Sequence, residues 1–441
     1  MSESDSDFES VHVLMGQFLT DRHSPDPLPD TSLLTENPTF EWGKGKPLEK
    51  VIHSQKELEL LMKNPALFRN AISIIEPWEH VGHNPLGEGV RASLNVAYIT
   101  QKIADCDSIL FPLWSSGTLD LDVVVPVITS GLAVVVEGGN PSARDATTFE
   151  GSNCSLDELH RFVEALLLSR TPTSALALFI CIGHQLAAQG HINLIKQAVR
   201  QVLRLDSLAR DRDGKMLKAL KHVCERIEAV GGSLKIVKNN GNLVAEGWDH
   251  PEFAVGSNEH KEVGDRKLHY YQSPDSDESG IPQELINAHE VTADEYEGVI
   301  DTTIEYEDEV NIAMFHSDEV NEEAILFANW AYRLLHNAII PYRSTIAGSS
   351  LAWLLKLPDA IEILCSTTLD DEVVTECSAT CIIYKDFESK KIRRSFTCQF
   401  HPELFSDLRV IGLRQPPTYQ EMKMDDGTRL FTRLLYEGMQ E

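Results

Sequence analysis

The sequence predicts an α/β protein with a doubly wound, mostly parallel β-sheet. Short apolar runs at 71–75, 109–113, 132–136 and 175–180 alternate with segments of helical periodicity. Strands that alternate with helices in short units are joined by crossovers, which make the strands parallel and cover the sheet with helices. The run at 175–180 is apolar at every position, as expected for a central strand that is buried on both faces.

The composition narrows the class of protein. The 441 residues include 39 Lys and Arg against 68 Asp and Glu, which gives a formal net charge of −29. This charge argues against nucleic-acid partners and anionic membrane surfaces, because both repel an acidic protein. No run approaches the roughly 18 apolar residues of a membrane span, and the N-terminus has neither the basic nor the apolar region of a secretory signal. We therefore expect a cytoplasmic protein that does not cross a membrane.

The eight cysteines lie at irregular spacing. They form no paired metal-ligand motif and are too sparse for the disulfide framework of a secreted domain. The closest pair, Cys377 and Cys381, lies in a β-type run and is interpreted as packing. His80 and His83, in the loop after 71–75, are interpreted as surface residues rather than metal ligands. We expect no metal site and no cofactor.

The first 190 residues divide into a tail and the first part of the α/β domain. Residues 1–50 are rich in Ser, Asp, Pro and Glu, and we expect an acidic, disordered tail. Within 51–190, helices are predicted at 50–68, 91–104 and 155–169 between the strands. Ser155 is the expected N-cap of the last of these helices.

The rest of the chain divides into an insertion and the second part of the domain. Residues 191–310 are predicted to hold two helices over 193–230, a hairpin that turns at 239–242, and an acidic flexible loop at 273–280. This segment is too long for a connection within a compact domain, and we interpret it as a regulatory or partner-docking addition. Residues 311–441 are predicted to contain a helix at 322–338, a strand at 361–367, a hairpin over 374–400 and a closing helix.

The stretch 175–188, ALALFICIGHQLAA, joins the most apolar strand to a helix through Cys181. A thiol at such a corner forms a nucleophile elbow, because the helix N-terminus stabilises negative charge on a thiolate and on an oxyanion. Gly183 leaves room for the tight turn. Cys181 is therefore the candidate nucleophile.

A second motif, QFHPE at 399–403, ends a β-type run with His401 and Glu403. Residues i and i+2 of an extended segment face the same side, and Pro402 restricts the backbone between them. Glu403 can then orient His401, and His401 can act as base toward Cys181. These three residues form the candidate catalytic set.

The two motifs and an earlier one, VVVEGGNPSARDA at 134–146, resemble the three motifs of class I glutamine amidotransferase domains, which use a Cys-His-Glu triad. All three occur in the family's order, and 134–146 is similar to the family's oxyanion loop. The resemblance implies a flavodoxin-like fold built from 51–190 and 311–441. It implies glutamine as substrate, hydrolysed through a thioester on Cys181, with ammonia passing to an acceptor. The chain has no GxxxxGK[ST] motif, so the acceptor is expected on a partner such as a synthetase.

The resemblance also implies roles for residues around the triad. The backbone N–H of Ile182 and one from the loop of Gly138 and Gly139 would hold the oxyanion. Gln185 would contact the glutamine substrate. His316 lies in a segment similar to the family's His-x-Asp-x-Val and is the alternative base, but no Pro-Glu follows it.

Two features depart from the family pattern. Phe179 stands two residues before the nucleophile, where the family usually has Gly. The 220 residues (401 − 181) between Cys181 and His401 exceed the usual spacing. Two other functions therefore stay open beside a glutaminase: a γ-glutamyl amide or peptide hydrolase of the same triad family, and a non-catalytic scaffold on this fold.

Overall fold

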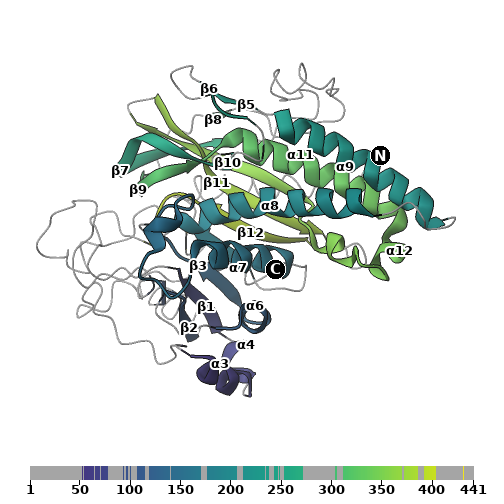
Figure 1. Cartoon of the computed structure of the whole chain (residues 1–441). Helices are drawn as coiled ribbons and strands as arrows, with labels where there is room; N and C mark the ends of the chain where they lie inside the picture. The colour runs from purple at the N-terminus through teal and green to yellow at the C-terminus, as the bar shows by residue number, and fades with distance from the viewer. Residues whose placement is uncertain are drawn as a thin grey trace, which may run out of the picture.

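The structure is a computed structural model of the chain (Figure 1). It describes residues 52–77 (except 53, 64 and 70), 93, 96, 97, 100, 107–114, 119–169 (except 140), 176–205, 212–271 (except 234, 238–242, 247 and 249–252), 303–304, 311–369, 372–385, 392–403 and 431. The predictions for the tail 1–50, for His80 and His83, for the acidic loop at 273–280 and for most of the closing helix lie outside these residues.

A ten-stranded sheet forms the centre of the described protein. Its order is β2-β1-β3-β4-β12-β11-β10-β7-β8, and β9 pairs with β7 beside this path. Two further strands, β5 and β6, pair only with each other. The strands are β1 Ala71–Glu76, β2 Asp107–Pro112, β3 Ala133–Val136, β4 Leu176–Ile180, β5 Lys235–Val237, β6 Leu243–Glu246, β7 Val255–Tyr271, β8 Thr303–Ile304, β9 Asn311–Val320, β10 Ala360–Leu369, β11 Glu372–Lys385 and β12 Ile392–Cys398.

The part of the sheet from β2 to β10 is mostly parallel. Strands β2, β1, β3, β4 and β12 are parallel in each of their pairings with one another, and antiparallel pairing begins where β12 meets β11. β4 lies between β3 and β12, and every residue of β4 is buried. The predicted α/β class is confirmed in this form, and so is the central position of the strand that leads to Cys181.

Helical residues cover both faces of the sheet. Phe179 and Leu178, neighbours on β4, belong to two different buried clusters. The cluster around Phe179 includes residues of α6, α7, α8, α9 and α11, and Figure 1 shows the last three side by side. The cluster around Leu178 includes Val96, Ala97 and Phe431, which are also helical.

The helices are as follows: α3 Gln55–Met62, α4 Ala66–Arg69, α6 Leu121–Thr129, α7 Leu156–Ser169, α8 Ile182–Arg204, α9 Arg212–Ser233, α11 Glu322–Ile339 and α12 Arg343–Ala347, with short 3₁₀ turns at Ala146–Phe149, Ile340–Tyr342 and Ala352–Lys356. The single helix predicted at 50–68 is therefore two short helices, α3 and α4. The predicted cap of α7 is present, because Ser155 and Glu158 hydrogen-bond each other's backbone N–H groups. None of the described helices combines the length and the apolar composition needed to cross a membrane.

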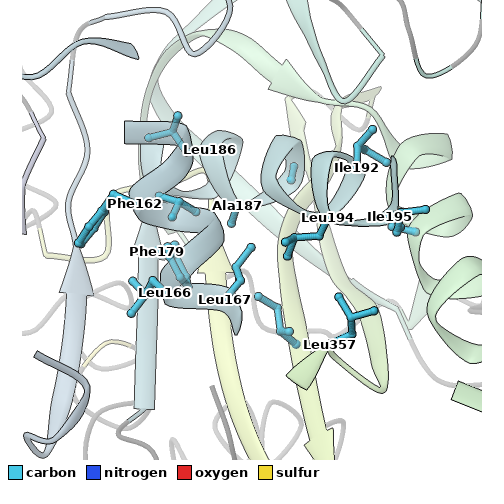
Figure 2. Packing of buried hydrophobic residues seen from close by; sticks show 14 of the residues in the cluster. Phe162, Leu166, Leu167, Phe179, Leu186, Ala187, Ile192, Leu194, Ile195 and Leu357 are labelled. Atoms are coloured by element: carbon cyan, nitrogen blue, oxygen red, sulfur yellow. The ribbon is translucent and has the colours of Figure 1, made fainter. Parts of the chain in front are cut away.

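The start of α8 packs closely on the sheet because Gly183 has no side chain. A Cβ at Gly183 would lie 2.9 Å from the carbonyl oxygen of Val136 on β3. The fully buried Phe179 packs in the cluster that includes Phe162 and Leu186, between the sheet and α7 and α8 (Figure 2). Pairing of β4 with β3 and β12 continues through Phe179, so the bulky ring fits without breaking the sheet.

The described part of 191–310 shares the core of the rest of the protein. α8 is continuous from Ile182 to Arg204, so the expected boundary between residues 190 and 191 falls inside a helix. α9 packs against α8 and α11, and β7 pairs with β10 and β9 in the main sheet. The predicted hairpin is present as β5 and β6. These elements extend the helical layer and the sheet instead of forming a separate unit.

A Gly231→Ala substitution near the end of α9 is expected to lower the free energy of unfolding by about 1–3 kcal/mol. A Cβ at Gly231 would lie 2.8 Å from the ring of Trp248 and 3.1 Å from that of Phe327 on α11. The adjacent Gly232 is the matched control, because a Cβ there meets nothing within 4 Å. Gly232→Ala should be neutral or stabilising, since Ala favours a helix over Gly by about 1 kcal/mol. Urea unfolding followed by circular dichroism measures both variants, and equal stabilities would contradict this packing.

Candidate catalytic site

Cys181 lies at the junction between β4 and α8, as predicted. Its backbone angles are φ 51° and ψ −110°, and it is the one non-glycine residue with positive φ among the described residues. Such a conformation is strained in a residue with a side chain and marks functional corners. The N–H of Cys181 donates to the carbonyl oxygen of Cys398 on β12 at 2.7 Å, which holds the corner against the neighbouring strand.

His401 and Glu403 follow directly after β12. The predicted hairpin of β11 and β12 is present, and β12 runs parallel to β4, so the carboxyl ends of both strands lie at the same edge. Nδ1 of His401 and Oε1 of Glu403 are 2.7 Å apart. The Glu403 side chain is fully buried. The carboxylate therefore fixes the orientation of the imidazole ring, and leaves Nε2 for another partner.

The imidazole of His401 contacts the thiol of Cys181. Burial by itself lowers the pKa of His401, but the negative charges of Glu403 and of a Cys181 thiolate, together with hydrogen bonds to both groups, raise the pKa well above its ordinary value. The structure thus favours an imidazolium on His401. This protonated ring can stabilise a thiolate at Cys181 and can later give its proton to a leaving group.

The loop of Gly138 and Gly139 lies against this pair. A Cβ at Gly138 would lie 2.6 Å from Cε1 of His401 and 2.9 Å from Cβ of Cys181, so only glycine fits there. Ile182 opens α8, and the first N–H groups of a helix have no partner within the helix. The residues predicted for the oxyanion site are thus brought beside the thiol on two sides.

Asp318, on β9, bonds two side chains of the loop that follows Gly139. Its carboxylate accepts a hydrogen bond from Oγ of Ser142 at 2.5 Å and pairs with Nη2 of Arg144 at 3.0 Å. Its side chain is nearly buried, which shields the ion pair from solvent. In the sequence, Asp318 is the aspartate of the segment similar to His-x-Asp-x-Val, in which only His316 was given a candidate role. The contact of Asp318 with Ser142 spans 176 residues and cannot be read from that segment alone.

Gln185 lies inside the protein beside the triad. Its Nε2 donates to the main-chain oxygen of Asp318 at 2.9 Å and to Oε1 of Gln399 at 3.2 Å. An amide nitrogen has two hydrogens, so these two acceptors use both. The predicted contact between Gln185 and a glutamine substrate stays a prediction.

Gln399, the first residue of the QFHPE motif, also lies at the candidate site, although no role was predicted for it. Its Nε2 lies 3.8 Å from Sγ of Cys181 and donates to it. The signal was present in the sequence, because Gln399 and His401 are two residues apart at the end of an extended run and can face the same side.

His316, the alternative base, serves a different contact. Nδ1 of His316 lies 2.8 Å from the main-chain oxygen of Asp318. A carbonyl oxygen can only accept, so Nδ1 carries the hydrogen and donates it. The ring that hydrogen-bonds Cys181 is that of His401. The geometry therefore favours His401 as base.

The six described cysteines other than Cys181 are all buried thiols. Burial raises the pKa of Cys154 and of Cys224 to about 12, and it raises that of Cys398 well above its ordinary value. Such thiols stay protonated and unreactive. Within the described residues, no group of three or more His, Cys, Asp and Glu side chains is arranged as a metal site.

Comparison of the chain with models of protein families finds no match, and comparison with curated proteins finds no similar sequence.

A Glu403→Gln substitution is expected to lower the pKa of His401 by about 1–3 units, because it removes the negative charge that favours the imidazolium. Titration of the His401 Cε1–H resonance by NMR measures this shift, with His401→Gln used to assign the signal. An unmoved titration curve would contradict the coupling between the two side chains.

Proposed function

We propose that the protein is a glutaminase of the class I glutamine amidotransferase type, which hydrolyses the side-chain amide of glutamine to glutamate and ammonia. One observation carries the proposal: Cys181 stands at a strained strand–helix corner in contact with His401, which hydrogen-bonds the buried Glu403. This set supplies the nucleophile, the base and the orienting group of covalent amide hydrolysis. The mostly parallel sheet with the thiol after a central strand supports the flavodoxin-like fold of that family.

In the first half of the reaction, the thiolate of Cys181 attacks the amide carbon of glutamine. The negative charge that develops on the amide oxygen is held by N–H groups of Ile182 and of the loop of Gly138 and Gly139, and such a donor is typically worth roughly 3–4 kcal/mol. When the tetrahedral intermediate collapses, the amide nitrogen takes the proton of His401 and leaves as ammonia. The γ-glutamyl group remains on the sulfur as a thioester.

In the second half, neutral His401 removes a proton from water, which attacks the thioester carbon. The carbon–sulfur bond breaks, glutamate leaves, and the thiolate and the imidazolium are restored. Glu403 stabilises the imidazolium at both ends of this cycle, because its carboxylate stays within hydrogen-bond distance of Nδ1.

The ammonia acceptor would lie on a partner protein such as a synthetase. The chain has no GxxxxGK[ST] motif that would bind a nucleotide for acceptor activation. The seven described cysteines are free thiols, which supports a reducing, cytoplasmic location.

A Cys181→Ala variant is expected to release no ammonia from glutamine above the rate without protein, because it cannot form the thioester. Cys224→Ala, which removes a buried thiol of α9, should keep the parental rate. Ammonia and glutamate are both measured with glutamine and with a panel of γ-glutamyl amides. Turnover of substituted amides alone would replace the glutaminase with a γ-glutamyl hydrolase, and parental turnover in Cys181→Ala would exclude the covalent mechanism.

An Asp318→Asn variant is expected to lose up to about 10²-fold in turnover, because misplacement of a catalytic loop by about 1 Å has effects of that size. The neutral amide loses the ion pair with Arg144 that helps to hold the loop of Gly138 and Gly139. Glu319→Gln is the control, since successive residues of a strand point to opposite faces. The test compares the steady-state glutaminase rates and the melting curves of the two variants. Equal rates in Asp318→Asn and Glu319→Gln would show that Asp318 does not position the loop.

A further inference from the structure

We infer that Gln399 is a further catalytic residue, whose side-chain amide donates an N–H to Sγ of Cys181 and stabilises the thiolate, and that Gln185 is the positioning residue that orients this amide. The role of Gln399 in catalysis rests on the proposed function. The hydrogen bonds themselves are features of the protein without substrate.

The orientation of both amides follows from one main-chain oxygen. The carbonyl oxygen of Asp318 can only accept, so the end of Gln185 that faces it at 2.9 Å is Nε2. The second hydrogen of that nitrogen goes to Gln399 at 3.2 Å, which makes the facing atom of Gln399 its Oε1. The other end of the Gln399 amide is then Nε2, and it faces Sγ of Cys181 at 3.8 Å. The chain of bonds therefore presents a donor, not an acceptor, to the sulfur.

The surroundings strengthen this donor. Gln399 is fully buried and Gln185 is 3% exposed, so water does not compete for the amides. A hydrogen bond to a charged sulfur is stronger in such a site than in water. The main-chain N–H of Gln399 donates to the carbonyl oxygen of Ser378 on β11 at 2.8 Å. This bond fixes the backbone from which the side chain of Gln399 extends.

Besides Gln399, three groups act on the charge of the Cys181 sulfur from the elements packed around it. The imidazolium of His401 and the N-terminus of α8 favour the thiolate. The carboxylate of Glu403 opposes it, and the Cys398 thiol on β12 is held neutral by burial. Gln399 adds a neutral donor that stabilises the thiolate without competing with Glu403 for the proton of His401. The same donor stabilises the sulfur when the thioester breaks and the thiolate leaves.

The test is the pH dependence of Cys181 alkylation by iodoacetamide, followed by mass spectrometry of the peptide that contains Cys181. In Gln399→Leu the midpoint of alkylation should move up by about one pH unit, because one hydrogen bond to the thiolate is lost. Gln185→Leu removes the bond that orients the Gln399 amide. It should raise the midpoint of alkylation by a smaller amount than Gln399→Leu does. Gln189→Leu is the matched control: Gln189 lies one turn along α8, bonds Asn193, and should leave the midpoint unchanged.

Gln399→Glu is a second variant for the case in which Gln399→Leu does not fold, because the Glu side chain has nearly the same shape as that of Gln. A carboxylate beside the sulfur should move the midpoint up further. An unchanged or lower midpoint in the folded Gln399 variants overturns the inference. Alkylation needs no substrate, so a shifted midpoint in a protein without glutaminase activity supports the donor role and rejects only the proposed function. Glutaminase activity with an unshifted midpoint rejects only the donor role.

Discussion

The hydrogen bond from the N–H of Cys181 to the carbonyl oxygen of Cys398 is the contact on which the candidate site depends. It joins the end of β4, which carries the thiol, to the end of β12, which is followed by His401 and Glu403. A strained backbone such as that of Cys181 persists only where its surroundings determine it. The bond to β12 and the close packing of Gly183 on β3 supply this constraint from both sides.

The strands and the places of Cys181, His401 and Glu403 in the fold could be predicted because their signals are local. Runs such as 132–136 and 175–180 are apolar throughout, since parallel strands covered on both faces have no polar side. Cys181 is marked by the abrupt change from strand to helix pattern, and His401 and Glu403 by their spacing in an extended segment. Each of these features is contained within about ten residues of sequence.

The features that the sequence did not reveal are set by contacts between distant residues. β7 has few apolar residues, and its strand conformation depends on pairing with β9 and β10 rather than on its own pattern. This pairing is why the described part of 191–310 is continuous with the core. Asp318 lies in the segment similar to His-x-Asp-x-Val, but its bond to a loop 176 residues away cannot be read from that segment. The two hydrogen bonds of the Gln185 amide nitrogen to Asp318 and Gln399 also join distant residues, and its predicted contact with substrate stays a prediction.

The long separations within the site have a consequence for biosynthesis. Gln399 and Cys181 are 218 residues apart, so their contact forms only after a large part of the chain has closed on itself. Domains fold as the chain leaves the ribosome, from the N-terminal side onward. A nascent chain that has exposed β4 but not yet residue 403 carries Cys181 without its imidazole and amide partners. The contacts of Cys181 with His401 and Gln399 thus belong to a chain that extends at least to residue 403, and shorter translation products lack them.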